Sequence, residues 1–241
     1  MTDWIQSLNE KFTSYSKAEF DYIESTDINQ AKKIDLGASG IYMEASVIDF
    51  EIKNLNFIIK EFGRRDAALV YTKCNEIISA IAERTGGFVN DFSPNSILII
   101  YPGKEEAMTN SIKGAMKVVS ALCETFKPHF SSITGFEFGM GIDHGHIMGI
   151  KTLSDGNFEK ITWFGSCIYK AIRICKESSR PFYISISGCI YRNLGNDMKT
   201  ATRRILGIKK NVDVWTKVTY QYENVKKHLY QTNHKISPEE E

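Results

Sequence analysis

The stretch that most constrains the fold runs from Gly86 to Tyr101 and reads GGFVNDFSPNSILIIY. Before it, apolar residues recur at spacings of three and four over residues 66–84, which predicts an amphipathic helix. Gly86 and Gly87 can adopt the positive φ that ends a helix. Two short apolar runs follow, separated by residues 93–96, and they predict a β-hairpin. Such a hairpin holds the side chain at its tip at a fixed height beside the neighbouring strand.

The remaining sequence alternates predicted strands and helices. Runs of β-branched and aromatic residues indicate the strands, and periodic apolar residues indicate the helices. The order of elements predicts one α/β (α+β) domain around a mostly antiparallel sheet with flanking helices, preceded by an N-terminal helical arm. We expect strands at residues 44–52, 158–164 and 182–186, two strands within 135–150, a closing hairpin of strands 204–210 and 212–220, and helices at 4–25, 54–62, 105–126 and 165–176.

The chain divides into three parts by composition. Residues 1–36 combine the helical arm with a polar linker, which we expect over residues 25–40 and which ends in Gly-Ala-Ser-Gly. Residues 37–226 carry all of the remaining predicted elements and form the domain. Residues 227–241 end in SPEEE and are expected to be a flexible tail.

Charge and cysteine content exclude several classes of protein. Lys and Arg total 30 against 29 Asp and Glu, a net charge of +1, which favours neither a nucleic-acid partner nor a membrane surface. The five cysteines form no Cys-x-x-Cys pair, and their odd number and irregular spacing are typical of reduced cytosolic thiols. The chain shows no signal peptide and no apolar run of about 18 residues. We therefore expect a cytoplasmic protein without a membrane partner.

Four segments, in this order, resemble class III nucleotide (adenylate/guanylate) cyclases. VIDFEIKNL resembles the family's strand ending in Asp-Ile-x-Gly, and GGFVNDFSPNSILIIY resembles its hairpin with Gly-Asp at the tip. FGMGIDHGHIMGI resembles the Gly-Ile-x-x-Gly strand pair, and ITWFGSCIYKAIRICKES resembles the Gly-x-x-x-Asn-x-x-x-Arg helix entry. Together they span roughly residues 40–220. GIDHGHIMGIKT, ITWFGSCIYKA and the helical arm most resemble bacterial anti-phage Pycsar pyrimidine (uridylate/cytidylate) cyclases.

This resemblance implies a reaction and an assembly. The 3′-hydroxyl of a nucleoside triphosphate attacks its own α-phosphate and releases pyrophosphate. Two divalent ions, Mg²⁺ or Mn²⁺, activate the hydroxyl and hold the phosphates, and facing carboxylates supply their oxygen ligands. In the family, two protomers pack head to tail, so each site takes residues from both. The implied partners are a nucleoside triphosphate and either a second copy of this chain or another cyclase chain.

The resemblance places the family's metal carboxylates at Glu51 and Asn95. Glu51 keeps the charge but is one methylene longer, whereas Asn95 keeps only an acceptor oxygen. Pro94 stands where the family has Gly and stiffens the tip. A divalent ion held by one carboxylate and one amide would bind weakly. The alternative interpretations are a solvated acid at a strand end for Glu51 and an ordinary turn residue for Asn95.

Four further positions follow from the helix entry and the closing hairpin. The family's transition-state Asn falls on Tyr169 and its Arg on Arg173, so only the Arg is kept. The Lys that holds the triphosphate falls on Lys209 or Lys210. An exposed helix Arg and a charge in a hairpin turn are the alternative interpretations of these residues.

The base-reading positions are both changed. The purine-reading Lys and Asp of the family fall on Asp91 and Thr162, which argues against ordinary adenine recognition and permits a pyrimidine or no base. His144 and His146 share one face of a predicted strand at a spacing that could bind Zn²⁺, but no third ligand is evident.

Three functions follow from this pattern. The favoured one is a degenerate cyclase-like protein that binds a nucleoside triphosphate or a partner cyclase chain with reduced or no catalysis, with Mg²⁺ or Mn²⁺ as cofactor if it is active and otherwise none. The second is an active uridylate/cytidylate cyclase that uses Mg²⁺ or Mn²⁺ and makes a 3′,5′-cyclic pyrimidine nucleotide as an anti-phage signal. The third is a non-enzymatic dimeric interaction module.

Overall fold

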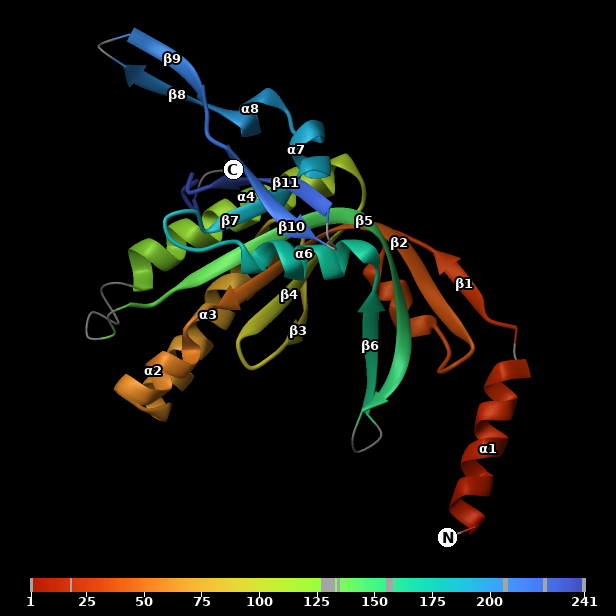
Figure 1. Cartoon of the computed structure of the whole chain (residues 1–241). Helices are drawn as coiled ribbons and strands as arrows, with labels where there is room; N and C mark the ends of the chain where they lie inside the picture. The colour runs from red at the N-terminus through yellow and green to blue at the C-terminus, as the bar shows by residue number, and fades with distance from the viewer. Residues whose placement is uncertain are drawn as a thin grey trace.

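The computed structural model describes residues 2–17, 19–126, 133, 135–154, 158–205, 208–222 and 225–239 of the chain. It shows a mixed α+β fold in which helices cover both faces of a mostly antiparallel sheet (Figure 1). This is the fold class that the order of predicted elements indicates. None of the helices within those ranges is both long and apolar enough to cross a bilayer.

Nine strands of the described chain form the central sheet. Its main path runs β10-β11-β7-β5-β2-β4-β3, while β1 pairs with β2 and β6 with β5. Among the strand pairs of the described residues, only β1–β2 and β5–β7 are parallel. The strands are β1 (Asp21–Glu24), β2 (Ser39–Ile52), β3 (Phe88–Phe92), β4 (Ser96–Pro102), β5 (Phe138–Ser154), β6 (Phe158–Phe164), β7 (Ile184–Ser187), β10 (Thr216–Tyr222) and β11 (Val225–Thr232).

The helices form two layers around this sheet (Figure 1). Apolar residues of α3 and α4 share one core with β2 and β4, and residues of α6 share a second core with the opposite face of β2. A separate hairpin of β8 (Thr200–Ile205) and β9 (Ile208–Asp213) projects from the sheet. The helices are α1 (Thr2–Lys17), α2 (Leu55–Phe62), α3 (Arg64–Arg84), α4 (Glu105–Ala121), α6 (Ser166–Lys176), α7 (Gly188–Asn193) and α8 (Asn196–Lys199), with a 3₁₀ turn η1 (Ile28–Lys33) and a π turn η2 (Leu122–Phe126).

The alternation of β2 decides which of its side chains meet α6. Ile48, Phe50 and Ile52 point into the core shared with α3 and α4. Because successive strand residues face opposite sides, Asp49 and Glu51 face α6 instead. Two carboxylates therefore lie on the α6 face of a strand whose other face is apolar.

The close approach of α6 to β5 depends on glycine. A Cβ at Gly141 would lie 2.1 Å from the Ala171 carbonyl oxygen and 2.3 Å from the Cys175 amide nitrogen. A Cβ at Gly139 would lie 2.7 Å from the Ser178 carbonyl oxygen. No side chain fits at these distances. The glycines of FGMGIDHG thus let the helix lie directly on the strand.

The N-terminal region differs from the sequence prediction. The helix expected over residues 4–25 ends at Lys17, and β1 follows and pairs with β2. The expected linker contains η1, in which Ala31 is buried, and Ile34 is buried just after it. Phe20 and Tyr22 are spaced well enough to extend the helical pattern, but Tyr22 lies in β1, whose conformation is determined by pairing with β2.

The C-terminal half differs in three places. The two strands predicted within 135–150 are one long strand, β5. The predicted closing hairpin is replaced by two hairpins, β8–β9 and β10–β11. Residues 227–232, which the sequence places in the flexible tail, lie in β11, where Leu229 is fully buried.

Candidate functional site

Glu51 and Asn95 lie side by side, as the resemblance predicts. Antiparallel pairing of β2 with β4 sets Glu51 opposite Ser96, and the Ile52 amide donates to the Asn95 carbonyl oxygen over 2.8 Å. The Asn95 side-chain Nδ2 donates to Glu51 Oε1 over 3.2 Å. The hairpin tip therefore presents an amide donor to Glu51 rather than a second carboxylate.

Lys53 occupies the other side of the Glu51 carboxylate. Its Nζ lies 2.5 Å from Glu51 Oε2 and donates to the Cys175 carbonyl oxygen over 2.7 Å. The side chains of Lys53 and Glu51 are 15% and 24% exposed, so the pair is largely shielded from water. Sequence reasoning missed Lys53, which lies in the turn just after β2 and whose contacts join it to Glu51 and to the distant Cys175.

Asp49 and Cys175 lie beneath this pair. Asp49 is 6% exposed, and burial raises its pKa to about 6, opposed by a hydrogen bond with Cys175. Burial also raises the pKa of the Cys175 thiol, and the neighbouring Asp49 charge adds to that rise. The Cys175 thiol donates to the Gly139 carbonyl oxygen over 3.4 Å. Burial thus keeps the Cys175 thiol protonated and brings the titration of the Asp49 carboxyl closer to neutral pH.

These residues do not fit a divalent metal ion. One oxygen of Glu51 accepts a hydrogen bond from an amide N–H, and the other contacts an ammonium group. A hard cation requires several converging oxygen ligands, whereas cationic and N–H donors converge here. In the described part of the chain, no group of three or more His, Cys, Asp or Glu residues is arranged to hold a metal.

The two residues predicted on the helix entry lie on the outer side of α6. Tyr169 is 63% exposed. Arg173 donates from Nη2 to the Gln221 carbonyl oxygen over 3.3 Å and lies 3.4 Å from Glu177 Oε1. The structure therefore places them away from the sheet-facing side of the helix that contacts Glu51.

The remaining predicted residues are dispersed. Lys209 and Lys210 lie in β9 on the projecting hairpin, opposite Arg204 and Arg203 (Figure 1). Thr162 lies in β6, and its hydroxyl shares a 2.8 Å hydrogen bond with Thr152. The Asp91 backbone pairs with Leu98, but its side chain lies outside the described part of the structure.

The histidine pair has partners other than a metal. His144 Nε2 lies 3.0 Å from Glu44 Oε1, and this hydrogen bond lowers the pKa of the Glu44 carboxyl. The His146 ring stacks on Tyr42 with centroids 5.1 Å apart. Both rings therefore have partners in the sheet, consistent with a structural role.

Comparison with known proteins identifies the fold. No protein-family model and no curated protein sequence matches the chain. Among solved structures, the guanylyl cyclase Cya2 is similar, with a TM-score of 0.66 and 14% identity over 83% of this chain and 96% of that one. The adenylyl cyclase CyaB from P. aeruginosa gives a TM-score of 0.65 at 15% identity, covering 80% of this chain and 95% of that one. The chain has the class III cyclase fold.

A third similar structure is a class III adenylyl cyclase-like ATP-binding protein from Pseudomonas aeruginosa. Its TM-score is 0.64 at 10% identity, and the match covers 79% of this chain and 42% of that one. Similarity at these identities concerns the fold alone, so the function of this chain depends on its own residues.

Proposed function

We propose that this chain is a class III cyclase-like protein of the Pycsar pyrimidine-cyclase type that binds a nucleoside triphosphate or a partner cyclase chain with reduced or no catalysis. The observation that carries this proposal is the contact of Lys53 with Glu51. In the cyclase reaction, a divalent ion lies beside this carboxylate. Here a side-chain cation occupies that place.

The charges around Glu51 support the loss of metal-dependent chemistry. Two unit charges about 4 Å apart near a protein surface interact by about 4 kcal/mol. A divalent ion beside Glu51 would meet repulsion of at least this order from Lys53, or would have to displace it. Asn95 supplies no negative charge to offset that cost. Metal-activated attack by the 3′-hydroxyl is therefore disfavoured at this site.

Two observations support a retained binding role. Arg173 keeps the residue type that the family uses against phosphate charge. The similar structure from Pseudomonas aeruginosa is described as an adenylyl cyclase-like ATP-binding protein, so a protein with this fold binds a nucleotide. Neither the choice of base nor binding itself requires Glu51 to hold a metal.

The outer face of α6 supports pairing with a second chain. Tyr169, Ile172 and the preceding Phe164 are exposed large side chains on or next to this helix. Clustered exposed aromatic and aliphatic side chains are typical of protein–protein contacts. A head-to-tail homodimer, or a heterodimer with an intact cyclase chain, would cover them.

The test is a product assay followed by a binding assay. The full chain is incubated with Mn²⁺ and each of the four nucleoside triphosphates, and cyclic nucleotides are sought by mass spectrometry. We expect no cyclic product, and we expect at least one triphosphate to raise the melting temperature, because a ligand selective for the folded state stabilises it.

Two outcomes would contradict this proposal. Formation of a cyclic pyrimidine nucleotide would show an active cyclase. Absence of any stabilisation by triphosphates, together with no association with another cyclase chain, would favour the non-enzymatic dimeric module.

A further inference from the structure

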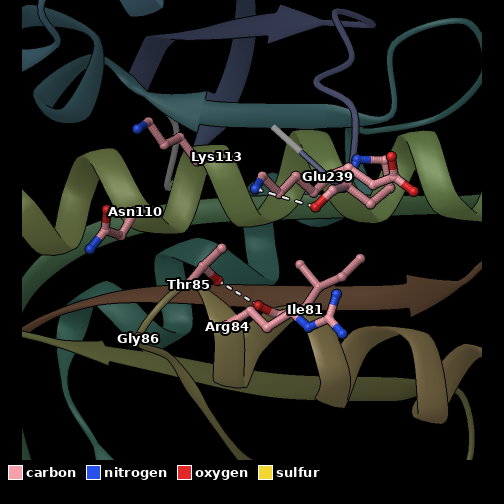
Figure 2. A pocket seen from close by; sticks show the side chains of 9 residues that line it. Ile81, Arg84, Thr85, Gly86, Asn110, Lys113 and Glu239 are labelled. Carbon is pink, nitrogen blue, oxygen red and sulfur yellow. Dashed lines mark hydrogen bonds between the residues drawn. The ribbon is translucent and has the colours of Figure 1, made fainter. Parts of the chain in front are cut away.

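A cavity of about 560 Å³ lies on the sheet face opposite Glu51. The C-terminal turn of α3 forms one wall, α4 forms another, and Pro238 and Glu239 close a third side (Figure 2). Ile81 provides an apolar surface at its base. Its volume is within the range of cavities that hold small ligands, about 300–1,000 Å³.

Three cations line this cavity, with one acid at its rim. Asn110, Lys113 and Lys117 recur at spacings of three and four, so they share the side of α4 that faces α3. Arg84 comes from the last turn of α3. Within the described residues, neither Arg84 nor Lys113 forms a hydrogen bond or ion pair through its side chain. The lining therefore carries excess positive charge.

Helix capping does not explain these cations. Positive side chains near a helix C-terminus often satisfy its free carbonyl groups. Here those groups already have backbone donors: the Thr85 amide donates to the Ile81 carbonyl oxygen over 3.0 Å, and the Gly87 amide donates to that of Ala82 over 2.8 Å. In addition, Lys113 and Lys117 repel each other as like charges four residues apart on a helix.

We propose that this cavity binds a phosphorylated small molecule of about mononucleotide size. Arg84 from α3 and Lys113 from α4 provide the positive charge that attracts the phosphate, because charged donors form the strongest hydrogen bonds to phosphate oxygens. The Asn110 amide adds a neutral donor or acceptor. Ile81 and Pro238 provide apolar contact for the rest of the ligand. This site lies in a different layer from the cyclase-like site.

The C-terminal segment shapes this site. Lys117 Nζ donates to the Pro238 carbonyl oxygen over 3.5 Å, which holds the segment against α4. Glu239 then lies at the rim (Figure 2). Its carboxylate would repel a phosphate, so its neutralisation should strengthen binding.

The test is calorimetric titration of the full chain with inorganic phosphate, adenosine monophosphate, uridine monophosphate and the two unphosphorylated nucleosides. We expect the monophosphates to bind and the nucleosides not to bind. Arg84→Ala and Lys113→Ala should each weaken binding about tenfold, equivalent to about 1.4 kcal/mol. Glu239→Gln should strengthen binding. Lys60→Ala, which removes an exposed helix charge from α2, is the matched control and should bind as the natural chain does.

Two results would overturn the proposal. One is the absence of binding by all three phosphate probes. The other is binding that the Arg84 and Lys113 variants retain, particularly if Arg173→Ala abolishes it, because the ligand would then occupy the cyclase-like site. Circular dichroism confirms that each variant is folded. A cyclic product in the activity assay would contradict the proposed function without affecting this cavity.

Discussion

Lys53 lies just beyond the end of β2, on the same face as Glu51, and contacts a carboxylate that is mostly shielded from water. A short contact between opposite charges in such a place contributes more than one on an open surface, because water screens it less. The chain also contains an exposed pair of similar length, Lys73 and Glu76, whose Nζ–Oε2 distance is 2.6 Å. The two pairs separate the effect of burial from the effect of distance.

We expect Lys53→Ala to lower the free energy of unfolding by about 1–2 kcal/mol, because it leaves Glu51 charged and partly buried without its partner. Lys73→Ala should cost less than about 0.5 kcal/mol. Urea unfolding followed by circular dichroism measures both. Equal losses of unfolding free energy in the two variants would show that partial burial does not make the Lys53–Glu51 contact more stabilising than an exposed pair.

Asp49 makes stability depend on pH. Its pKa is about 6 in the folded chain, above the usual 3.8 of an aspartate side chain. The folded state therefore binds more protons than the unfolded state between these values, so this group lowers stability as the pH rises from about 4 to about 6. Asp49→Asn should remove that part of the slope, at most about 1.4 kcal/mol per pH unit. Parallel urea titrations of both proteins from pH 4.5 to pH 7 that gave equal slopes would count against the shifted pKa.

At this scale, the sequence predicts some contacts and misses others. Glu51 and Asn95 could be placed together because strand pairing and a short hairpin determine their positions. Lys53 was missed because its contact with Cys175 joins residues far apart along the chain, and no local pattern indicates it. Lys53 is also not one of the site positions that the resemblance to class III cyclases implies.

At the scale of elements, α6 lies directly on β5 at Gly141. The helix orients Cys175 toward β2 and Tyr169 toward solvent, so its distance from the sheet determines the geometry around Glu51. Gly141 has no free space above it, whereas a Cβ at Gly145 would lie 3.4 Å from Cys167 Cβ, an ordinary contact distance. Replacing each of these two glycines with alanine therefore tests the close approach of α6 to β5.

Gly141→Ala should lower the free energy of unfolding by about 2–3 kcal/mol, because the new methyl group forces backbone of α6 away from the strand. Gly145→Ala should change it by less than about 1 kcal/mol. Thermal unfolding of both variants measures the difference. A well-folded Gly141→Ala variant with unchanged stability would contradict the packing described here.

Strongly periodic elements could be predicted, and weakly apolar ones could not. The sequence predicted α3, α4 and α6, whose apolar residues recur with a clear period, and β4, which is a continuous apolar run. It placed most of β11 in the tail because lysines dominate the start of that strand, and only Leu229 among its residues is a buried apolar side chain. The pairing of β11 with β7 and β10 stabilises it, and such pairing is not visible locally.

At the scale of the whole molecule, we propose that a second chain covers the outer face of α6. Its exposed residues are on the same side as Arg173, which a head-to-tail arrangement would present to the partner. The opposite layer offers a matched position, because Leu69 of α3 is also an exposed large apolar residue. Replacing Tyr169 and Leu69 each with Glu therefore compares the outer face of α6 with the exposed face of α3.

We expect the chain to associate in a concentration-dependent manner, and we expect Tyr169→Glu to shift it toward monomer. Leu69→Glu should leave association unchanged. Sedimentation velocity over a range of concentrations measures both. A natural chain that stays monomeric throughout would point to a heterodimer with another cyclase chain rather than to a homodimer.

We propose that Lys53 takes the place of the metal ion beside Glu51. The most direct measurement is Mn²⁺ titration, followed by electron paramagnetic resonance, of the natural chain, Glu51→Gln, and the double variant Lys53→Ala with Asn95→Asp. We expect the natural chain to show no Mn²⁺ binding that depends on Glu51. We expect the double variant to gain such binding. One equivalent of Mn²⁺ bound by the natural chain and lost in Glu51→Gln would contradict this proposal.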